Sequence, residues 1–424
     1  MERFVLKGCF SDTPTPEALR VRTGYALCEE GRWSGFAETL PEAWAALPLT
    51  DTGDALILPG LTDLHLHAPQ YGYAGTAMDL QLLDWLERYT FPEESRFADT
   101  AYADAAYTRF TNDLLRSATT SACVFATIHT DATLLLMEKL EAAGLKSFVG
   151  RVSMDRNSPD SYREPSAEAG LAGVRDWLDR CESAGFRHTK PMLTPRFTPS
   201  VTDEYMRGLG ELAKERRLPA QSHLNENRDE IAWVRSLCPD AAHYADTYDR
   251  FGLLDVPCVM AHCIYNTPEE AELLRRKGVY IAHCPTSNAN VVAGMAPAAA
   301  QLRGGWRIGL GSDVAGGHTL NLFGVMACAI RVSKLRWLEK DPSQKPLTVS
   351  EVLYMATVGG GSFFGEDGHP RGLFEPGCPF DAIVLDDAAL RTTVACEGAQ
   401  RVERYIYRGS GLPVAKYVDG RRLF

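Results

Sequence analysis

Two histidines one residue apart stand at the end of a short apolar run. The run reads ILPGLTDLHLH and ends at His65 and His67. In a β-strand, side chains two positions apart lie on the same face, so the two imidazoles project together. Pro69 follows and stops the strand, which places the pair at its C-terminal end. Such a pair can hold a transition metal, although a histidine pair in a strand is more often simply structural.

Three further groups of the kind that bind zinc end other apolar runs. His223 ends PAQSH, His262 ends VMAH and Asp313 ends IGLGSD. With the first pair they provide four imidazoles and one carboxylate. Three or four such ligands, with one position left open to water, are typical of a catalytic zinc site rather than a structural one. Taken singly, His223 could close a strand, His262 could be a core histidine and Asp313 could cap a helix.

Glu226 lies three residues after His223. A metal-activated water needs a nearby base that accepts its proton and returns it to the leaving group, and a carboxylate beside the metal suits that task. The alternative is a surface acid near the start of the helix expected over 227–234, where a negative charge is favourable in any case. We expect Glu226 to be catalytic.

These groups must be positioned by a parallel sheet, because strand-like runs alternate with helical periodicity along the middle of the chain. Eight such runs over about 270 residues predict a (β/α)8 barrel of the TIM type. A doubly wound open sheet is the competing fold, but no Gly-x-Gly-x-x-Gly follows the first strand to favour it. The predicted strands are Leu61–His67, Ser121–Thr127, Ser147–Met154, Pro191–Phe197, Pro219–Leu224, Cys258–Cys263, Tyr280–Cys284 and Ile308–Asp313.

A barrel carries its catalytic groups at the C-terminal ends of its strands. The histidines and Asp313 end the first, fifth, sixth and eighth predicted strands. They are therefore expected to meet at one rim. Their joint placement, more than any single residue, predicts the metal site.

Short alternating runs at both ends of the chain indicate a second, smaller unit. We expect a β-sandwich built from both termini, with residues 1–58 and 373–424 flanking a catalytic barrel over 59–372. Its predicted strands are Phe4–Phe10, Arg22–Cys28, Arg32–Phe36, Phe380–Leu385, Val402–Tyr407 and Ala415–Val418.

The composition fits an enzyme-sized globular chain of 424 residues, with 45% hydrophobic and 23% charged residues. A net charge of −11 argues against nucleic acid or an anionic membrane as a partner. The start lacks the pattern of a signal peptide, and no apolar run is long enough to span a bilayer. Eleven scattered cysteines without Cys-x-x-Cys favour reduced thiols and a cytoplasmic location.

At this point the sequence resembles the mononuclear deaminase branch of the amidohydrolase superfamily, over nearly the whole chain. The set HxH, then HxxE, then His, then Asp carries the resemblance. It is sharpened by PGLTDLHLHAPQYGYAG, FATIHTD, PRFTPS, QSHLNENRDE, VMAHC, IAHCPTSN and IGLGSDVAGG.

The resemblance implies a role for each of the matching residues. His65, His67, His223 and Asp313 would hold one zinc ion. Glu226 would be the proton shuttle, with His262 and Asp313 orienting the attacking water. The substrate would be held by Gln70, Arg196 and Phe197, together with His223, Glu226 and Asp313.

The chemistry of the side chains agrees with these roles. The Arg196 guanidinium can donate to a purine carbonyl, Phe197 can lie against a ring face, and the Gln70 amide offers both a donor and an acceptor. Each residue also has an alternative, purely structural interpretation. Arg196 could be ion-paired, Phe197 could belong to the core, and Gln70 could form a turn.

The implied reaction is hydrolytic deamination of a small-molecule purine, guanine, to xanthine and ammonia, in purine catabolism or salvage. Close alternatives are deaminases of 8-oxoguanine, a pterin or an aminotriazine, and a more distant one is a non-catalytic scaffold. Binuclear relatives carry a bridging lysine at the end of the fourth strand, but Lys190 lies at the beginning of that strand here, so one metal ion is expected.

Several further expectations are supported by fewer residues. Iron suits the same ligands as zinc. His283 ends the seventh predicted strand and is expected just outside the ligand set. His129, His188, His243, His318 and His369 are expected to be structural. A homodimer is the default for an enzyme of this size.

Overall fold

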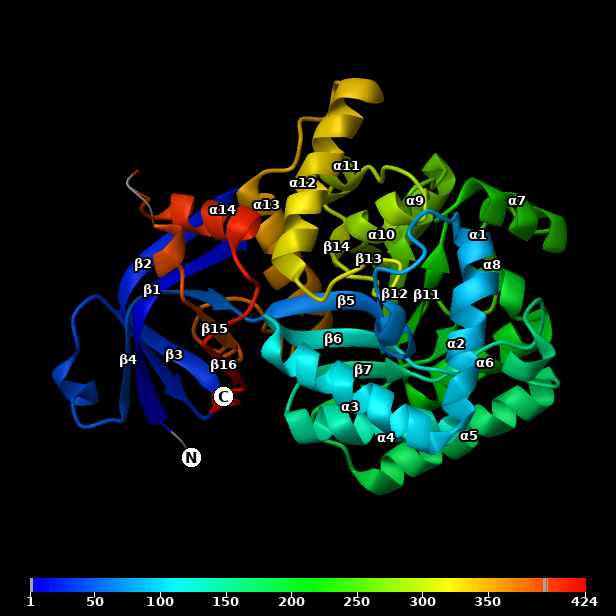
Figure 1. The fold of residues 1–424 in the computed structure, drawn as a ribbon, viewed down its shortest axis with the longest axis horizontal. Coiled ribbons are helices and arrows are strands. Elements are labelled where there is room, and N and C mark those ends of the chain that lie inside the picture. The colour runs from blue at the N-terminus through cyan, green and yellow to red at the C-terminus, as the bar shows by residue number, and fades with distance from the viewer. Residues whose placement is uncertain (1–2, 392–393, 395) are drawn as a thin grey trace.

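The strand that carries the two histidines, β5 (Leu61–His67), opens a parallel barrel in the computed structural model, which describes residues 3–391, 394 and 396–424. Figure 1 shows the barrel beside a smaller sheet to which both ends of the chain contribute. Within the described residues the barrel strands form two four-stranded parallel sheets. They are β5, β6 (Thr119–Phe125), β7 (Lys146–Gly150) and β9 (Thr189–Pro191), then β11 (Ala220–Leu224), β12 (Cys258–His262), β13 (Tyr280–His283) and β14 (Arg307–Leu310).

Backbone hydrogen bonds close the two sheets into a barrel. Leu193, just after β9, bridges Ala220 of β11. On the other side, the N–H of Asp313 donates to the carbonyl of His65 at 2.8 Å, and the N–H of His67 donates to the carbonyl of Val314 at 2.9 Å. The predicted fourth strand is interrupted. Its end, β10 (Thr194–Pro195), pairs with β8 (Val152–Ser153).

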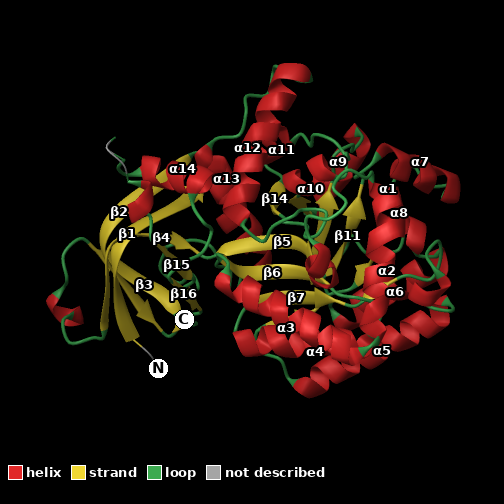
Figure 2. Ribbon diagram, viewed as in Figure 1, coloured by secondary structure: helices red, strands yellow, loops and turns green. Residues whose placement is uncertain are grey.

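The barrel strands are buried on both faces, because side chains fill the interior and helices cover the outside. Every residue of β5 and of β6 is buried. Figure 2 shows the helices around the strands. The longer ones are α3 (Thr100–Arg116), α4 (Thr130–Ala143), α5 (Ala167–Ala184), α6 (Asp203–Arg216), α7 (Arg228–Leu237), α9 (Pro268–Lys277) and α12 (Leu322–Glu339). Shorter ones are α8 (Asp246–Asp249), α10 (Pro285–Asn290), α11 (Ala298–Arg303) and α13 (Val349–Tyr354).

A run of short helices follows β5 and reaches over the C-terminal ends of the strands. It consists of η2 (Ala68–Tyr73), α1 (Leu82–Trp85), the π-helix η3 (Leu86–Thr90) and α2 (Phe91–Ser95). Leu82, Trp85 and Leu86 of this run form part of a cavity wall. The residues after the two histidines therefore cover the rim on which those histidines lie.

The smaller sheet joins both ends of the chain. Its order is β17-β16-β15-β4-β1-β2-β3 among the described residues. The strands are β1 (Arg3–Thr15), β2 (Ala18–Glu29), β3 (Arg32–Ala37), β4 (Leu49–Pro59), β15 (Ala382–Leu385), β16 (Ala415–Val418) and β17 (Arg421–Arg422). Gly60 alone separates β4 from the first barrel strand.

The predicted fold class, a barrel with a β-rich unit from both termini, is confirmed. The small unit differs in detail, since hydrogen bonds connect its strands into one sheet that curls over its own core. Trp33 of β3 stacks on Phe374 and Phe380, and its N–H donates to the carbonyl of Cys378 at 2.8 Å. The domain limits at 58 and 372 stay a prediction.

One predicted strand is wrong. Residues 402–407 belong to the helix α14 (Ala399–Arg408), which buries Val402, Tyr405 and Ile406. These apolar positions are spaced three and four apart, which is the helical pattern, although β-branched and aromatic residues favour a strand. In addition, β4 was absent from the predicted strands. Among the described residues, none of the helices has the length and apolar character needed to cross a membrane.

Candidate active site

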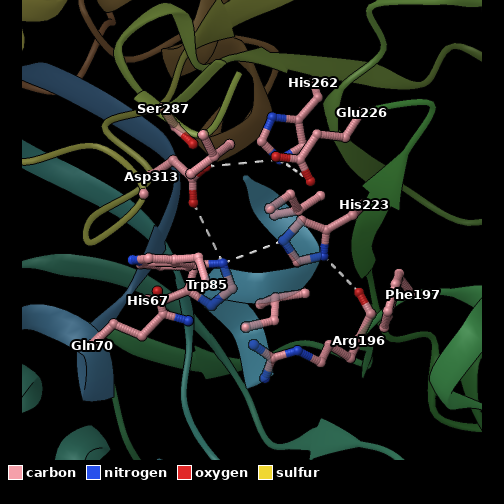
Figure 3. Close-up of a pocket in the computed structure, with 14 residues that line it drawn as sticks. His67, Gln70, Trp85, Arg196, Phe197, His223, Glu226, His262, Ser287 and Asp313 are labelled. Atoms are coloured by element: carbon pink, nitrogen blue, oxygen red, sulfur yellow. Dashed lines mark hydrogen bonds and ion pairs between the residues drawn. The ribbon is translucent and has the colours of Figure 1, made fainter. Parts of the chain in front are cut away.

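Five groups predicted from the strand ends meet at one rim of the barrel. Asp313 Oδ1 lies 3.2 Å from His65 Nε2 and 3.5 Å from His67 Nε2. His67 Nε2 lies 3.3 Å from His223 Nε2, and His262 Nε2 lies 3.8 Å from Asp313 Oδ2. Figure 3 shows how His67, His223, His262 and Asp313 point toward one another.

Two of these residues turn sharply as they leave their strands. His262 has φ of 71° and Asp313 has φ of 48°. Residues other than glycine seldom adopt this left-handed region, and such strain gathers at functional sites. Asp63 helps to hold the strand ends, because its Oδ1 accepts from the N–H groups of Ser312 (2.9 Å) and His65 (3.3 Å).

The arrangement of nitrogen lone pairs fits a cation. His223 Nδ1 donates to the carbonyl of Arg196 at 2.6 Å, so its Nε2 is left as an acceptor that faces His67. Within the described part of the chain, the buried Nε2 atoms of His65 and His262 have no hydrogen-bond partner. Two nitrogen ligands at about 2.0–2.1 Å from one tetrahedral ion lie about 3.3–3.4 Å apart, close to the distance between His67 and His223.

Burial and neighbouring groups together set the protonation states of the cluster. Burial, reinforced by the neighbouring imidazole of His65, holds the pKa of His67 and of His223 well below the usual value, so both rings are neutral. Burial opposes ionisation of Asp313, but the adjacent imidazole of His65 holds its pKa far below the usual range. Neutral imidazoles beside a carboxylate are what a divalent metal ion needs.

Glu226 lies beside this cluster, with Oε2 at 3.4 Å from His262 Nε2. Burial raises the pKa of its carboxyl well above the usual value, and the negative charges of Glu230 and Asp313 add to the effect. Glu230 also fixes the loop, because its Oε2 accepts from the N–H groups of Glu226 (3.0 Å) and Asn227 (3.1 Å). Glu226 is therefore a buried acid held rigidly at the rim.

His262 has a fixed orientation. Its Nδ1 lies 2.9 Å from Oδ1 of the buried Asn288, which accepts the ring proton. The amide oxygen cannot donate, so the other ring nitrogen, Nε2, is unprotonated toward Glu226 and Asp313. Burial lowers the pKa of His262 to about 4, which keeps the ring neutral at physiological pH.

A pocket opens beside the cluster, with about 450 Å³ of space that includes its opening to solvent. The predicted substrate residues Gln70, Arg196, Phe197, His223, Glu226 and Asp313 all line it, as do His67 and His262. Sequence reasoning missed the other lining residues, which are Leu82, Trp85, Leu86, Ser287, Val291 and Gly316. Ser287 and Gly316 fall within the quoted segments IAHCPTSN and IGLGSDVAGG, whereas the positions on α1, η3 and the residues after α10 gave no sequence signal.

The polar end of the cavity is anchored by a buried acid that was also missed. Glu94 of α2 accepts from Gln70 Nε2 at 2.7 Å and from Arg196 Nη1 at 2.5 Å. The Gln70 Oε1 accepts from the N–H of Ala315 at 3.2 Å. Glu94 of α2 thus fixes both Gln70 and Arg196 in place, and the N–H of Ala315 holds the other end of the Gln70 amide.

The structure places two residues singled out from the sequence, Lys190 and His283, outside the cluster. Lys190 of β9 is exposed, and no lysine lines the cavity among the described residues; the number of metal ions stays a prediction. His283 is buried close to His262, and burial lowers its pKa to about 3. Its side chain is absent from the cavity wall as described, and its role stays a prediction.

Comparison with known proteins places this site in a family. The model of the amidohydrolase family matches residues 56–410. The chain therefore belongs to the amidohydrolase family and is a hydrolase, and the resemblance drawn from its motifs is confirmed.

More particular similarities follow. The chain is 38% identical to guanine deaminase of Dictyostelium discoideum over 88% of its own length and 83% of that protein. It is 41% identical to guanine deaminase of Mus musculus, over 78% of this chain and 73% of that one. The crystal structure of guanine deaminase from C. acetobutylicum with bound guanine in the active site matches with a TM-score of 0.95 and 40% identity, over all of both chains.

Proposed function

We propose that this protein catalyses the zinc-dependent hydrolytic deamination of guanine to xanthine and ammonia. The observation that carries the proposal is the placement of one acid, Glu226, beside a cluster of metal-binding groups in the wall of a cavity that Arg196 and Gln70 also line. The similarity to guanine deaminases supports the choice of substrate.

We assign His65, His67, His223 and Asp313 as the residues that would hold the ion. The convergence of their ring nitrogens and of the carboxylate oxygen supports this assignment. When bound, zinc would lower the pKa of a water ligand toward neutrality and so provide a nucleophile. Iron suits the same ligands, and metal analysis distinguishes the two.

Glu226 would move the protons of the reaction. As a carboxylate it would take a proton from the attacking water, and as a carboxylic acid it would deliver that proton to a ring nitrogen of guanine. Burial favours the protonated form of Glu226, which makes it a ready donor once it has accepted. Ammonia then leaves the carbon to which the water oxygen has been added, so that guanine and water give xanthine and ammonia.

His262 and Asp313 would orient the attacking water. The hydrogen bond to Asn288 keeps the Nε2 of His262 free of a proton, so it can accept one hydrogen bond from the water. Asp313 lies between His65 and His262 and is ionised, so it can accept another. Together they would direct an oxygen lone pair at the substrate.

The opposite side of the cavity would hold the purine. Arg196 can donate to the ring carbonyl, and Gln70 can hydrogen-bond the amide edge. Phe197, fixed edge-on against Trp233, would lie along one face of the ring system, with Leu82 and Trp85 contributing apolar wall. The apolar part of the wall, formed by Leu82, Trp85 and Phe197, would cover the faces of the ring system.

Ammonia release from a panel of heterocycles tests the substrate. The panel is guanine, 8-oxoguanine, cytosine, pterin and melamine, each offered to zinc-loaded protein of measured metal content. Guanine should have the highest kcat/KM. Turnover of another member with none of guanine would overturn the substrate but keep the reaction class, whereas no ammonia from any member would overturn both.

We also propose that the protein acts as a homodimer in the cytoplasm, in purine catabolism or salvage. Mass determination in solution tests the first point, because a monomer at micromolar concentration would contradict it. Cell fractionation tests the second.

A further inference from the structure

Glu94 occupies an unusual position for an acid. It lies on the short helix α2, its side chain has no exposed surface, and it is absent from the residues that line the cavity. Burying a carboxylate is costly unless its charge is paired and both oxygens are hydrogen-bonded. The partners of Glu94 therefore indicate why it is there.

Both partners are residues of the cavity wall. Glu94 Oε2 accepts from Arg196 Nη1 at 2.5 Å, and Oε1 accepts from Arg196 Nη2 at 3.3 Å and from Gln70 Nε2 at 2.7 Å. A two-point contact of this kind fixes the plane of a guanidinium as well as its position. Phe91, one turn earlier on α2, supports the same group, with its ring centroid 5.1 Å from Arg196 Cζ.

Enough donors remain for a ligand. Arg196 has five N–H donors and gives two of them to Glu94. Gln70 has two and gives one, while its oxygen is engaged by the N–H of Ala315. Glu94 thus decides which donors face the cavity.

Glu94 also balances charge. Arg196 is buried, and an uncompensated guanidinium at the end of a cavity would favour an anionic ligand. The ion pair with Glu94, at 2.5 Å, offsets this positive charge, so the wall offers hydrogen bonds without net charge. A neutral ring with a carbonyl group is the kind of ligand that such a wall suits.

We propose that Glu94 is a positioning residue that aligns Arg196 and Gln70 and makes the cavity select a neutral purine over an anionic one. The inference rests on the proposed function, since it assumes that Arg196 and Gln70 contact the substrate. It adds a residue that acts through these two and does not touch the substrate itself.

The test compares Glu94→Gln with Glu93→Gln. Glu93 is the adjacent residue, but its partners are Arg96 and Tyr102, away from the cavity. Each variant is checked for fold by circular dichroism and for zinc by elemental analysis. Its kcat and KM for guanine are then measured, with inhibition constants for hypoxanthine, which is neutral, and for urate, which is anionic at neutral pH.

Glu94→Gln should keep its metal and lose about 10- to 100-fold in kcat/KM, chiefly through KM. Its binding preference should shift by about 10-fold or more from hypoxanthine toward urate. Glu93→Gln should stay within about three-fold of the wild type in every constant. In a double variant with Arg196→Gln, the effect of Glu94→Gln should shrink, because the two residues act together.

Glu94→Asp separates the effect of charge from the effect of geometry. It is also the test variant if Glu94→Gln does not fold. It keeps the charge balance but shortens the reach, so KM should rise while urate stays a poor inhibitor. The proposal is overturned if a folded, metal-loaded Glu94→Gln matches the wild type in KM and in inhibitor preference. It is also overturned if Glu94→Gln loses metal and activity together, because the residue would then be structural.

The two proposals can fail separately. A wild type that leaves guanine unchanged and deaminates another heterocycle overturns the substrate, and the same variant comparison is then made with that heterocycle. If the wild type deaminates guanine and Glu94→Gln matches it in KM and in inhibitor preference, only the present inference is overturned.

Discussion

His67 Nε2 and His223 Nε2 lie 3.3 Å apart, although the two residues are separated by 156 positions in the chain. The carbonyl of Arg196 holds the proton of His223 on Nδ1, so its Nε2 presents a lone pair to His67. Two neutral imidazoles at this distance, with a carboxylate beside them, are brought together most readily by a shared metal ion.

Removal of the metal should therefore lower both activity and stability. Chelation is expected to abolish turnover, and adding zinc back should restore it. An ion present at 100 times its dissociation constant stabilises the folded state by about 2.7 kcal/mol, so the thermal midpoint should rise with zinc. His223→Ala should lose this response, while His188→Gln, remote from the cluster, should keep it. Full activity in metal-free protein would contradict the assignment.

Glu226→Gln should retain metal and lose most turnover. The amide keeps the shape of the side chain but cannot accept and return a proton, and a positioned acid–base group contributes about 10²- to 10⁴-fold. Pre-steady-state and steady-state ammonia release measure kcat directly. Asp229→Asn, an exposed neighbour on α7, is the control. A fully active Glu226→Gln with bound zinc would show that the proton moves by another group.

Asn288→Ala should lower kcat with little change in KM. Without Oδ1 of Asn288, His262 loses the partner that keeps its proton on Nδ1, and its Nε2 no longer accepts consistently. Removing such an orienting partner typically costs about 10- to 100-fold. Metal content should stay constant, because neither Asn288 nor His262 is among the proposed ligands. A normal kcat would mean that His262 needs no fixed tautomer.

The stability of the protein should carry a pH dependence that comes from Lys416. This residue of β16 is fully buried, and its Nζ donates to the carbonyls of Thr119 (2.8 Å) and Leu114 (3.3 Å). Burial holds the pKa of Lys416 well below its ordinary value of 10.5. Between these two values the unfolded chain binds a proton that the folded chain does not, so raising the pH stabilises the fold.

Lys416→Met removes this contribution. Its free energy of unfolding, relative to wild type, is expected to fall as the pH rises toward the ordinary lysine value of 10.5, by up to about 1.4 kcal/mol for each pH unit. Urea unfolding at several pH values measures the difference. A constant difference across that range would show that Lys416 is charged in the folded protein.

Much of the barrel and the metal cluster was predictable, because the residues involved are marked by the apolar strand-like runs that they follow or end. An apolar run that ends in a polar group of suitable chemistry is a local signal, and β5 was predicted with its bounds intact. His65, His67, His223 and Asp313 then meet for a topological reason, since parallel strands of a barrel end at one rim.

The partners of the substrate residues were not predictable in this way. Glu94 reaches Arg196 across 102 positions, and nothing in the run FPEES distinguishes it from the more exposed Glu93. In the same way, Val402–Tyr407 contains residues that favour a strand, but packing of its apolar positions selects the helix α14. Contacts between distant segments decide both cases.

The closure of the barrel determines when, during synthesis on the ribosome, the full set of proposed ligands is present. Asp63 Oδ1 accepts from the N–H of Ser312 across 249 positions. This contact joins the first barrel strand to the residues after the last one, where Asp313 completes the cluster. A nascent chain that has released β5 holds two of the proposed ligands but has no Asp313 to join them. The full set of proposed ligands is thus present only after the last barrel strand has emerged, whereas His65, His67 and His223 are available earlier.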